Sequence, residues 1–254
     1  MRNNRLESLR KQSFNGLESL QDLDLSENLL SQFTIEQFRP MRQLRVLNLS
    51  RNRLRSLPRD VFSGTHLEIL DISRNKFTVV PSSSFLEVGY TLRSIDLSNN
   101  LIDHLDSSSF PTSQLVSLNL ANNKITILPD NSFDSLSRLV TLNLSYNYIR
   151  ANFKELFHYL PELRKLSLRN SKLKSLPFIS LQYLNYLDVT ENSIESISEN
   201  DLENFSALKV FLIANNSLNN FNGLKFPLLR ELDISGNPIK VCNSYLLIDH
   251  NSLL

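Results

Sequence analysis

A leucine and asparagine pattern recurs along this chain and constrains its fold more than any other feature. In residues 115–133, LVSLNLANNKITILPDNSF, Leu115, Leu118 and Leu120 precede Asn123. The same spacing returns at intervals of 21 to 25 residues. A fixed period of this length predicts a solenoid, in which each repeat packs only against its neighbours. The repeated position is occupied by Asn4, Asn28, Asn52, Asn75, Asn100, Asn123, Asn147, Ser171, Asn192, Asn216 and Asn237.

The first half of each repeat predicts a short β-strand. In residues 44–49, LRVLNL, Leu47 and Leu49 are expected to point inward, whereas Val46 and Asn48 alternate outward. Because a return path follows every strand, successive strands must be parallel. Residues 1–239 therefore predict an α/β solenoid with a concave parallel sheet of about ten short strands and a convex side that is irregular or short-helical.

The asparagine column is expected to satisfy backbone polar groups that are buried where each strand bends into its return path. An asparagine amide carries two donor hydrogens and an acceptor, and an unpaired buried polar group costs about 1–3 kcal/mol. Ser171 is shorter and cannot bridge as fully, so its turn should be a weak point. We expect a structural ladder at Asn28, Asn52, Asn75, Asn100, Asn123, Asn147, Asn192, Asn216 and Asn237.

The return paths carry a second apolar column and few helix signals. Leu-Pro pairs such as Leu57-Pro58 favour extended backbone, which leaves residues 153–160, FKELFHYL, as the best helix candidate. The repeats that follow Ser171 and Asn216 shorten to 21 residues, and we expect the curvature to change there. The apolar column is Phe14, Phe38, Phe62, Phe85, Phe110, Phe133 and Phe157, each ten residues after its asparagine.

The two ends of the chain do not read as complete repeats. The repeat that contains Asn4 lacks its strand half, so we expect the chain to begin mid-repeat, as a fragment or an incomplete gene model. Residues 1–12 do not resemble a signal peptide, and no apolar run is long enough to predict a membrane span. Residues 240–254 are expected to form a tail, a truncated repeat or a partial cap.

Composition and motif spacing argue against catalysis and against nucleic acid as a partner. The 27 basic and 26 acidic residues give a net charge of only +1, which provides no general attraction to polyanions. The chain has no glycine-rich phosphate loop and no nucleophile elbow. We therefore expect no catalytic residue, cofactor or metal ion. The histidines, which show no metal-ligand spacing, are His66, His104, His158 and His250.

Carboxylates recur at the last outward position of several predicted strands. A ladder of carboxylates invites a cation, but Asp and Asn at this position are also what such repeats prefer, and we favour that structural interpretation over a metal site. The carboxylates are Asp24, Asp71, Asp96, Asp188 and Asp233.

The strings LRVLNLSRNRLRSLPRDVFSG and LVSLNLANNKITILPDNSFDSL resemble the typical, 24-residue class of leucine-rich repeat. The resemblance implies a right-handed horseshoe with its sheet on the concave side. The chain is similar to Toll-like receptor ectodomains and chaoptin-like adhesion proteins, and this similarity implies extracellular or cell-surface ligand recognition or adhesion. The alternative is an intracellular scaffold or regulatory adaptor. The single cysteine, Cys242, which cannot form an internal disulfide, and the absent signal peptide favour that alternative.

Basic residues cluster around the second to fourth predicted strands, some just before a strand and others just after one. It could bind an acidic protein or a sulfated glycan, although Glu68 and Asp71 lie close enough in the sequence frame to neutralise it. The candidate ligand-binding cations are Arg45, Arg51, Arg53, Arg74, Lys76 and Arg93, with Arg42, Arg55 and Arg59 nearby.

Apolar residues at outward strand positions give a second candidate surface. Tyr186, Val210 and Leu212 fall on adjacent predicted strands, and a contiguous exposed apolar patch often marks a protein interface. A protein ligand, a co-receptor or a second copy of the chain could bind there. Other outward apolar residues, including Val46, Ile69 and Tyr146, are scattered.

Four N-glycosylation sequons are present, at Asn48, Asn143, Asn204 and Asn215. Two of them arise from the repeat's own LNLS string, so they are weak signals. Their use would indicate secretion and exposure of these sites.

Overall fold

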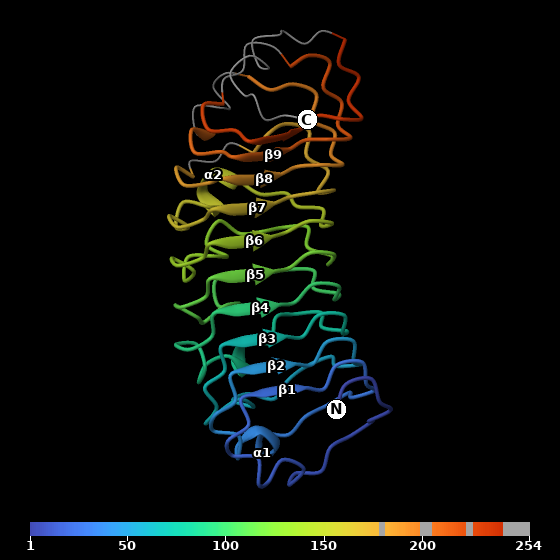
Figure 1. The fold of residues 1–254 in the computed structure, drawn as a ribbon, viewed down its shortest axis with the longest axis vertical. Helices are drawn as coiled ribbons and strands as arrows, with labels where there is room; N and C mark the ends of the chain where they lie inside the picture. Colours follow the sequence, from blue (N-terminus) through green and yellow to red (C-terminus); the bar gives the residue numbers. More distant parts are fainter. Residues whose placement is uncertain (178–180, 199–204, 222–225, 241–254) are drawn as a thin grey trace.

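The computed structural model describes residues 1–177, 181–198, 205–221 and 226–240. In this part the chain forms a single stack of short parallel strands, ordered β1 to β10 as in the sequence (Figure 1). This confirms the predicted solenoid. The strands are β1 Asp22–Asp24, β2 Val46–Asn48, β3 Ile69–Asp71, β4 Ser94–Asp96, β5 Ser117–Asn119, β6 Thr141–Asn143, β7 Lys165–Ser167, β8 Tyr186–Asp188, β9 Val210–Leu212 and β10 Glu231–Asp233.

Within the described residues, the helical segments of the return paths are short: α1 Ile35–Phe38, the 3-10 turn η1 Ser82–Ser84, and α2 Phe153–Leu156 (Figure 1). The helix expected over residues 153–160 is present but ends at Leu156. Residue 160 precedes Pro161, and helical backbone is disfavoured at that position. Helix α1 was not predicted. Its signal was the pair Thr34 and Gln37, since Gln37 Oε1 accepts the Thr34 N–H at 2.8 Å.

The core consists of leucine columns behind the strands and a phenylalanine column in the return paths. Leu47 and Leu49 are fully buried, and the expected column from Phe14 to Phe157 is at most 2% exposed. Phe38 packs against Phe14 and Phe62, with both pairs of ring centres 5.7 Å apart. Each turn therefore buries its apolar face against the next, as a solenoid requires.

The asparagine ladder joins adjacent turns through buried backbone groups. Asn52 Oδ1 accepts the Leu30 N–H of the preceding turn at 3.0 Å, and its Nδ2 donates at 3.0 Å to the carbonyls of Leu25 and Leu49. The same arrangement recurs at Asn75, Asn100, Asn123, Asn147, Asn192, Asn216 and Asn237, and Asn28 reaches Leu6 and Met1 in the first turn.

Ser171 interrupts this ladder. Its hydroxyl makes one long bond, donated to the Arg169 carbonyl at 3.4 Å. The Ile149 N–H, which an asparagine at position 171 would accept, forms no hydrogen bond within the described residues. Both neighbours, Asn170 and Lys172, have positive φ angles of 49° and 62°. Lys172 therefore adds a left-handed residue one position after the ladder, where no other described turn has one.

A column of left-handed residues lies one position before the ladder and was not predicted. The φ angles of its non-glycine members are between 49° and 58°, a region that costs most L-residues about 1 kcal/mol or more. Each such residue lies where the strand bends into the return path. The column is Asn3, Glu27, Arg51, Arg74, Asn99, Asn122, Tyr146, Asn170, Glu191 and Asn215.

Several expectations fall wholly or partly outside the described residues. The two shortened repeats are present as 21-residue steps from β7 to β8 and from β9 to β10, but their outer arcs include residues 178–180 and 222–225. Asn204, Cys242 and most of the expected tail also lie outside. Among the described residues, no helix has the length and apolar character needed to cross a membrane.

Candidate functional site: a hollow on the strand face

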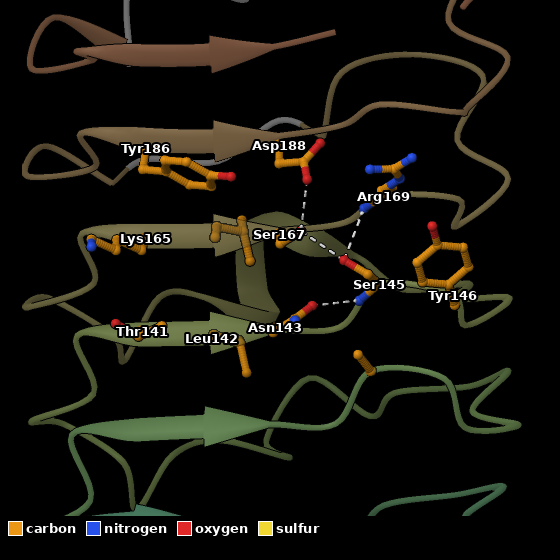
Figure 2. A pocket seen from close by; sticks show the side chains of 12 residues that line it. Thr141, Leu142, Asn143, Ser145, Tyr146, Lys165, Ser167, Arg169, Tyr186 and Asp188 are labelled. Atoms are coloured by element: carbon orange, nitrogen blue, oxygen red, sulfur yellow. Dashed lines mark hydrogen bonds between the residues drawn. The ribbon is translucent and has the colours of Figure 1, made fainter. Parts of the chain in front are cut away.

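A shallow hollow of about 380 Å³ lies on the strand face over β6, β7 and β8 (Figure 2). Each strand contributes side chains from its two outward positions, and the turns that follow β6 and β7 contribute Tyr146 and Arg169. The register places Thr141, Lys165 and Tyr186 in one column. It places Asn143, Ser167 and Asp188 in the next.

A chain of hydrogen bonds fixes the floor of the hollow (Figure 2). Asp188 is 8% exposed, and its Oδ2 accepts the Ser167 hydroxyl at 3.2 Å. Ser167 Oγ lies 2.6 Å from Ser145 Oγ, which in turn accepts the Arg169 N–H at 3.2 Å. The remaining Asp188 oxygen, Oδ1, accepts the Thr190 N–H at 3.0 Å. These groups are already paired, so the floor is rigid in the free protein.

The rim beside β6 and β7 is built from an aromatic ring and an ion pair. The guanidinium of Arg169 lies over the Tyr146 ring, 5.9 Å from its centre, within the range of a cation–π contact. Arg169 Nη2 also donates to Glu191 Oε1, and Asn170 Nδ2 donates to Glu191 Oε2 at 3.3 Å. The hydrogen bond between Arg169 and Glu191 raises the pKa of Arg169 and lowers the pKa of Glu191.

Tyr186 forms the opposite side of the hollow. Its burial, and then the negative charge of Asp188, raise the pKa of the phenol above its ordinary value. The phenol therefore stays neutral at physiological pH and can donate a hydrogen bond. Its ring lies along β8 in Figure 2, with the hydroxyl directed towards the Asp188 end of the strand. A neutral phenol, a paired guanidinium and the Lys165 ammonium thus surround the polar floor.

The apolar surface expected from the sequence adjoins this hollow. Tyr186 pairs with Val210, and Asp188 pairs with Leu212, in adjacent strands β8 and β9. Tyr186 lines the hollow, whereas Val210 and Leu212 extend beyond its lining on β9. All three side chains are half-buried.

Tyr146 was expected from the sequence to point outward, whereas Arg169 and Glu191 were not predicted as site residues. Arg169 lies two positions before the ladder position of its turn, and Glu191 lies one position before that of the next turn. The two residues therefore do not share a column. Their opposite charges in adjacent turns are the signal that could have indicated the pair.

The structure divides the expected basic cluster between two edges of the sheet. Arg45 and Arg93 immediately precede β2 and β4, while Arg51, Arg53, Arg74 and Lys76 follow β2 and β3. Of the two carboxylates expected to neutralise the cluster, Glu68 lies 3.8 Å from Arg45. Asp71 forms no ion pair within the described residues.

The carboxylate column has a structural role. Oδ1 of Asp71 accepts the Ser73 N–H at 2.9 Å, and Asp24 and Asp96 bond the N–H two residues on in the same way. Such a bond supports the turn after each strand. The part of the chain that the structure describes contains no group of three side chains suited to a metal ion.

The described sequons differ in accessibility. Asn48 and Asn143 are half-buried on strands β2 and β6, and their Oδ1 atoms accept the N–H of Ser50 and Ser145 at 2.9 and 3.0 Å. Asn215 is exposed in the turn after β9. The use of any of these sites stays a prediction.

Comparison with known proteins is consistent with this geometry. The leucine rich repeat profile matches residues 1–54, 42–89 and 90–149. The chain belongs to the leucine-rich-repeat family.

Among curated proteins, Tsukushi of Gallus gallus is 29% identical over 241 residues, covering 92% of this chain and 53% of Tsukushi. Toll-like receptor 3 of Homo sapiens is 26% identical over 213 residues, covering 80% of this chain and 18% of the receptor. This leucine-rich-repeat chain thus spans about half of the first relative and less of the second.

A solved structure described as the Toll–Spatzle complex, a molecular hub in Drosophila development and innate immunity, has the same fold. It aligns with a TM-score of 0.71 at 19% identity, covering 91% of this chain and 35% of that chain. At this identity the likeness supports the fold alone.

Proposed function

We propose that this leucine-rich-repeat chain is a non-enzymatic recognition or adhesion module that binds a protein partner through its strand face. It would form part of a receptor ectodomain outside the cell. The observation that carries the proposal is the hollow over β6 to β8, where Tyr146, Arg169 and Tyr186 surround a rigid polar floor.

The chemistry of this surface suits a protein ligand. Tyrosine and arginine are enriched among the residues that dominate binding energy in protein interfaces. Val210 and Leu212 extend the hollow with half-buried apolar side chains, and a contiguous patch of this kind often marks an interface. Because the sheet is held by the ladder and the core, the partner would meet a surface that changes little on binding.

The relatives support the same class of function. Toll-like receptor 3 of Homo sapiens is, by its name, a receptor. This relationship favours ligand recognition over the scaffold alternative for this chain.

Binding to a panel of purified secreted proteins and ectodomains tests the proposal. The chain would be immobilised as wild type, Tyr186→Asp and Tyr146→Ala. A true partner should bind the wild type saturably and lose at least about tenfold in affinity with either substitution, because truncating a central interface residue costs about 1.4 kcal/mol or more.

Tyr90→Asp is the matched control, because Tyr90 is 81% exposed and lies in a return path, away from the strand face. A partner that binds Tyr186→Asp normally but loses affinity for Tyr90→Asp would contradict a strand-face site. The extracellular assignment has its own test. Material from a eukaryotic secretory host should shift in mobility after glycosidase treatment, whereas unmodified material and a cytosolic full-length protein would support the scaffold alternative.

A further inference from the structure

A group of exposed cations follows strands β2 and β3, away from the hollow. Arg53 and Arg55 lie in the turn after β2, and Arg74 and Lys76 lie in the turn after β3. All four side chains are exposed. These four residues are called the basic edge below.

Backbone hydrogen bonds continue from turn to turn at the basic edge. The Arg53 N–H donates to the Leu30 carbonyl and the Lys76 N–H donates to the Leu54 carbonyl, both at 2.8 Å. The Arg74 N–H donates to the Ser98 carbonyl at 2.9 Å. Adjacent turns are therefore about 4.8 Å apart here, as adjacent strands are. The edge is a regular array rather than a set of loose loops.

Buried residues alternate with the cations and fix their attachment points. Leu54, between Arg53 and Arg55, is fully buried, and so is Phe77 after Lys76. The ladder residue Asn75, between Arg74 and Lys76, is 8% exposed. The backbone positions of the cations are therefore anchored by buried neighbours, while the charged groups themselves are exposed.

Nearby carboxylates do not neutralise the basic edge. Glu27 is 2.9 Å from Arg2 and 4.0 Å from Arg51, and Asp60 is 3.3 Å from Arg59. Within the described residues, no member of the basic edge forms an ion pair. Four uncompensated charges on two adjacent turns stand out in a chain whose net charge is +1.

The column of the basic edge also lacks the aromatic side chains on which protein and nucleic-acid sites depend. The positions equivalent to Arg53 and Lys76 in the flanking turns are Leu29 and Leu101, so no aromatic side chain lies in this column on either side. Protein interfaces depend on buried aromatic or apolar anchors at their centre. Single-stranded nucleic acids depend on aromatic side chains on which bases stack. The basic edge offers charge without an aromatic ring, and its apolar neighbours in this column are the half-buried Leu29 and Leu101, which is 38% exposed.

We propose that the basic edge is a binding site for a sulfated polysaccharide. A linear chain of sulfate groups supplies closely spaced negative charges, and the planar guanidinium forms paired hydrogen bonds with tetrahedral oxyanions. Three of the four cations are arginines. The site is separate from the hollow over β6 to β8, so this proposal can be tested independently of the proposed protein partner.

The test is binding of a size-defined heparin oligosaccharide, measured between 50 and about 300 mM NaCl because polyanion binding weakens with salt through counterion release. The site variant replaces Arg53, Arg55, Arg74 and Lys76 together with serine. The matched control replaces four exposed cations from other turns, Lys124, Lys174, Lys209 and Arg230, so both variants lose the same charge. Thermal melting verifies that both variants are folded.

We expect the site variant to lose at least about tenfold in affinity and to show a shallower dependence on salt, while the control loses much less. Equal losses in the two variants would overturn the proposal, because only net charge would then matter. Undiminished binding of fully desulfated heparin would also overturn it. Single-stranded oligonucleotides of equal length and charge should bind more weakly than the heparin oligosaccharide. Equal or tighter binding would overturn the proposal, because the site would then bind any polyanion.

Discussion

The guanidinium carbon of Arg169 lies 5.9 Å from the centre of the Tyr146 ring. Tyr146 belongs to the left-handed column, and Arg169 lies one position earlier in the next turn. The turn geometry therefore brings together two side chains that alternation along the strands would not pair. Glu191, in the turn after that, accepts a hydrogen bond from Arg169 Nη2. Three successive turns thus fix one rim of the hollow.

The Arg169–Glu191 pair predicts a pH dependence of stability. Because Arg169 lowers the pKa of Glu191 below its ordinary value of 4.5, the pair stabilises the folded chain above that value and stops doing so as the pH falls through the lower, folded-state pKa. Glu191→Gln should therefore lower the melting temperature at pH 7, and the difference from wild type should narrow at pH 3. Glu7→Gln, at an exposed glutamate, is the control. A difference that is constant with pH would show that the charge of Glu191 is not responsible.

The ladder predicts unequal costs for removing Asn123 and Ser171. Asn123 accepts the Ile102 N–H at 3.0 Å and donates to the carbonyls of Leu97 and Leu120, so Asn123→Ala should destabilise the chain by about 2–4 kcal/mol. The Ser171 hydroxyl makes a single bond at 3.4 Å, and Ser171→Ala should cost less than about 1 kcal/mol. Midpoints of urea unfolding provide the measurement. Equal shifts for the two variants would mean that the amide bonds are not what the ladder contributes.

The regular parts of this fold could be predicted because each depends on a residue type at a fixed offset. Leu47 and Phe62 mark the core columns and Asn52 marks the bend, so the sequence predicted strand order, register and the ladder position. The left-handed column could not be predicted in this way. Residues as different as Glu27, Arg74 and Tyr146 occupy it, because the ladder bonds around it, rather than the residue's own preference, determine its backbone.

The site was harder to predict than the fold for a related reason. Tyr186, Val210 and Leu212 could be grouped because strand register places them side by side. The Arg169–Glu191 pair joins two positions that do not share a column. The split of the basic cluster depends on whether a residue precedes or follows its strand. Arg45 and Arg51 are six positions apart, yet a strand separates them. Sequence distance alone therefore overstated their proximity.

Because position 74 belongs to the left-handed column, the stability of the chain should depend on whether the residue there is glycine, unbranched or β-branched. Arg74 has a φ of 54°, which glycine adopts freely and β-branched residues resist. Arg74→Gly should raise the unfolding free energy by up to about 1 kcal/mol, because relief of strain exceeds the added entropy of the unfolded chain. Arg74→Val should lower it by about 1–2 kcal/mol. Lys76→Gly and Lys76→Val, two residues on and outside the left-handed column, are the controls. The same ranking at both positions would contradict the conformational explanation.

Ser171→Asn should repair the ladder. At the preceding turn, Asn147 accepts the Ile125 N–H at 3.1 Å and donates at 3.0 Å to the carbonyls of Leu120 and Leu144. An asparagine at position 171 would meet the corresponding groups, including the Ile149 N–H that now lacks a partner within the described residues. Each bond formed contributes about 1 kcal/mol, so we expect a gain of about 1–2 kcal/mol in urea unfolding, with protection of the Ile149 amide from hydrogen exchange. A loss of stability with no added protection would mean that the second left-handed residue, Lys172, fixes a turn that an asparagine cannot enter.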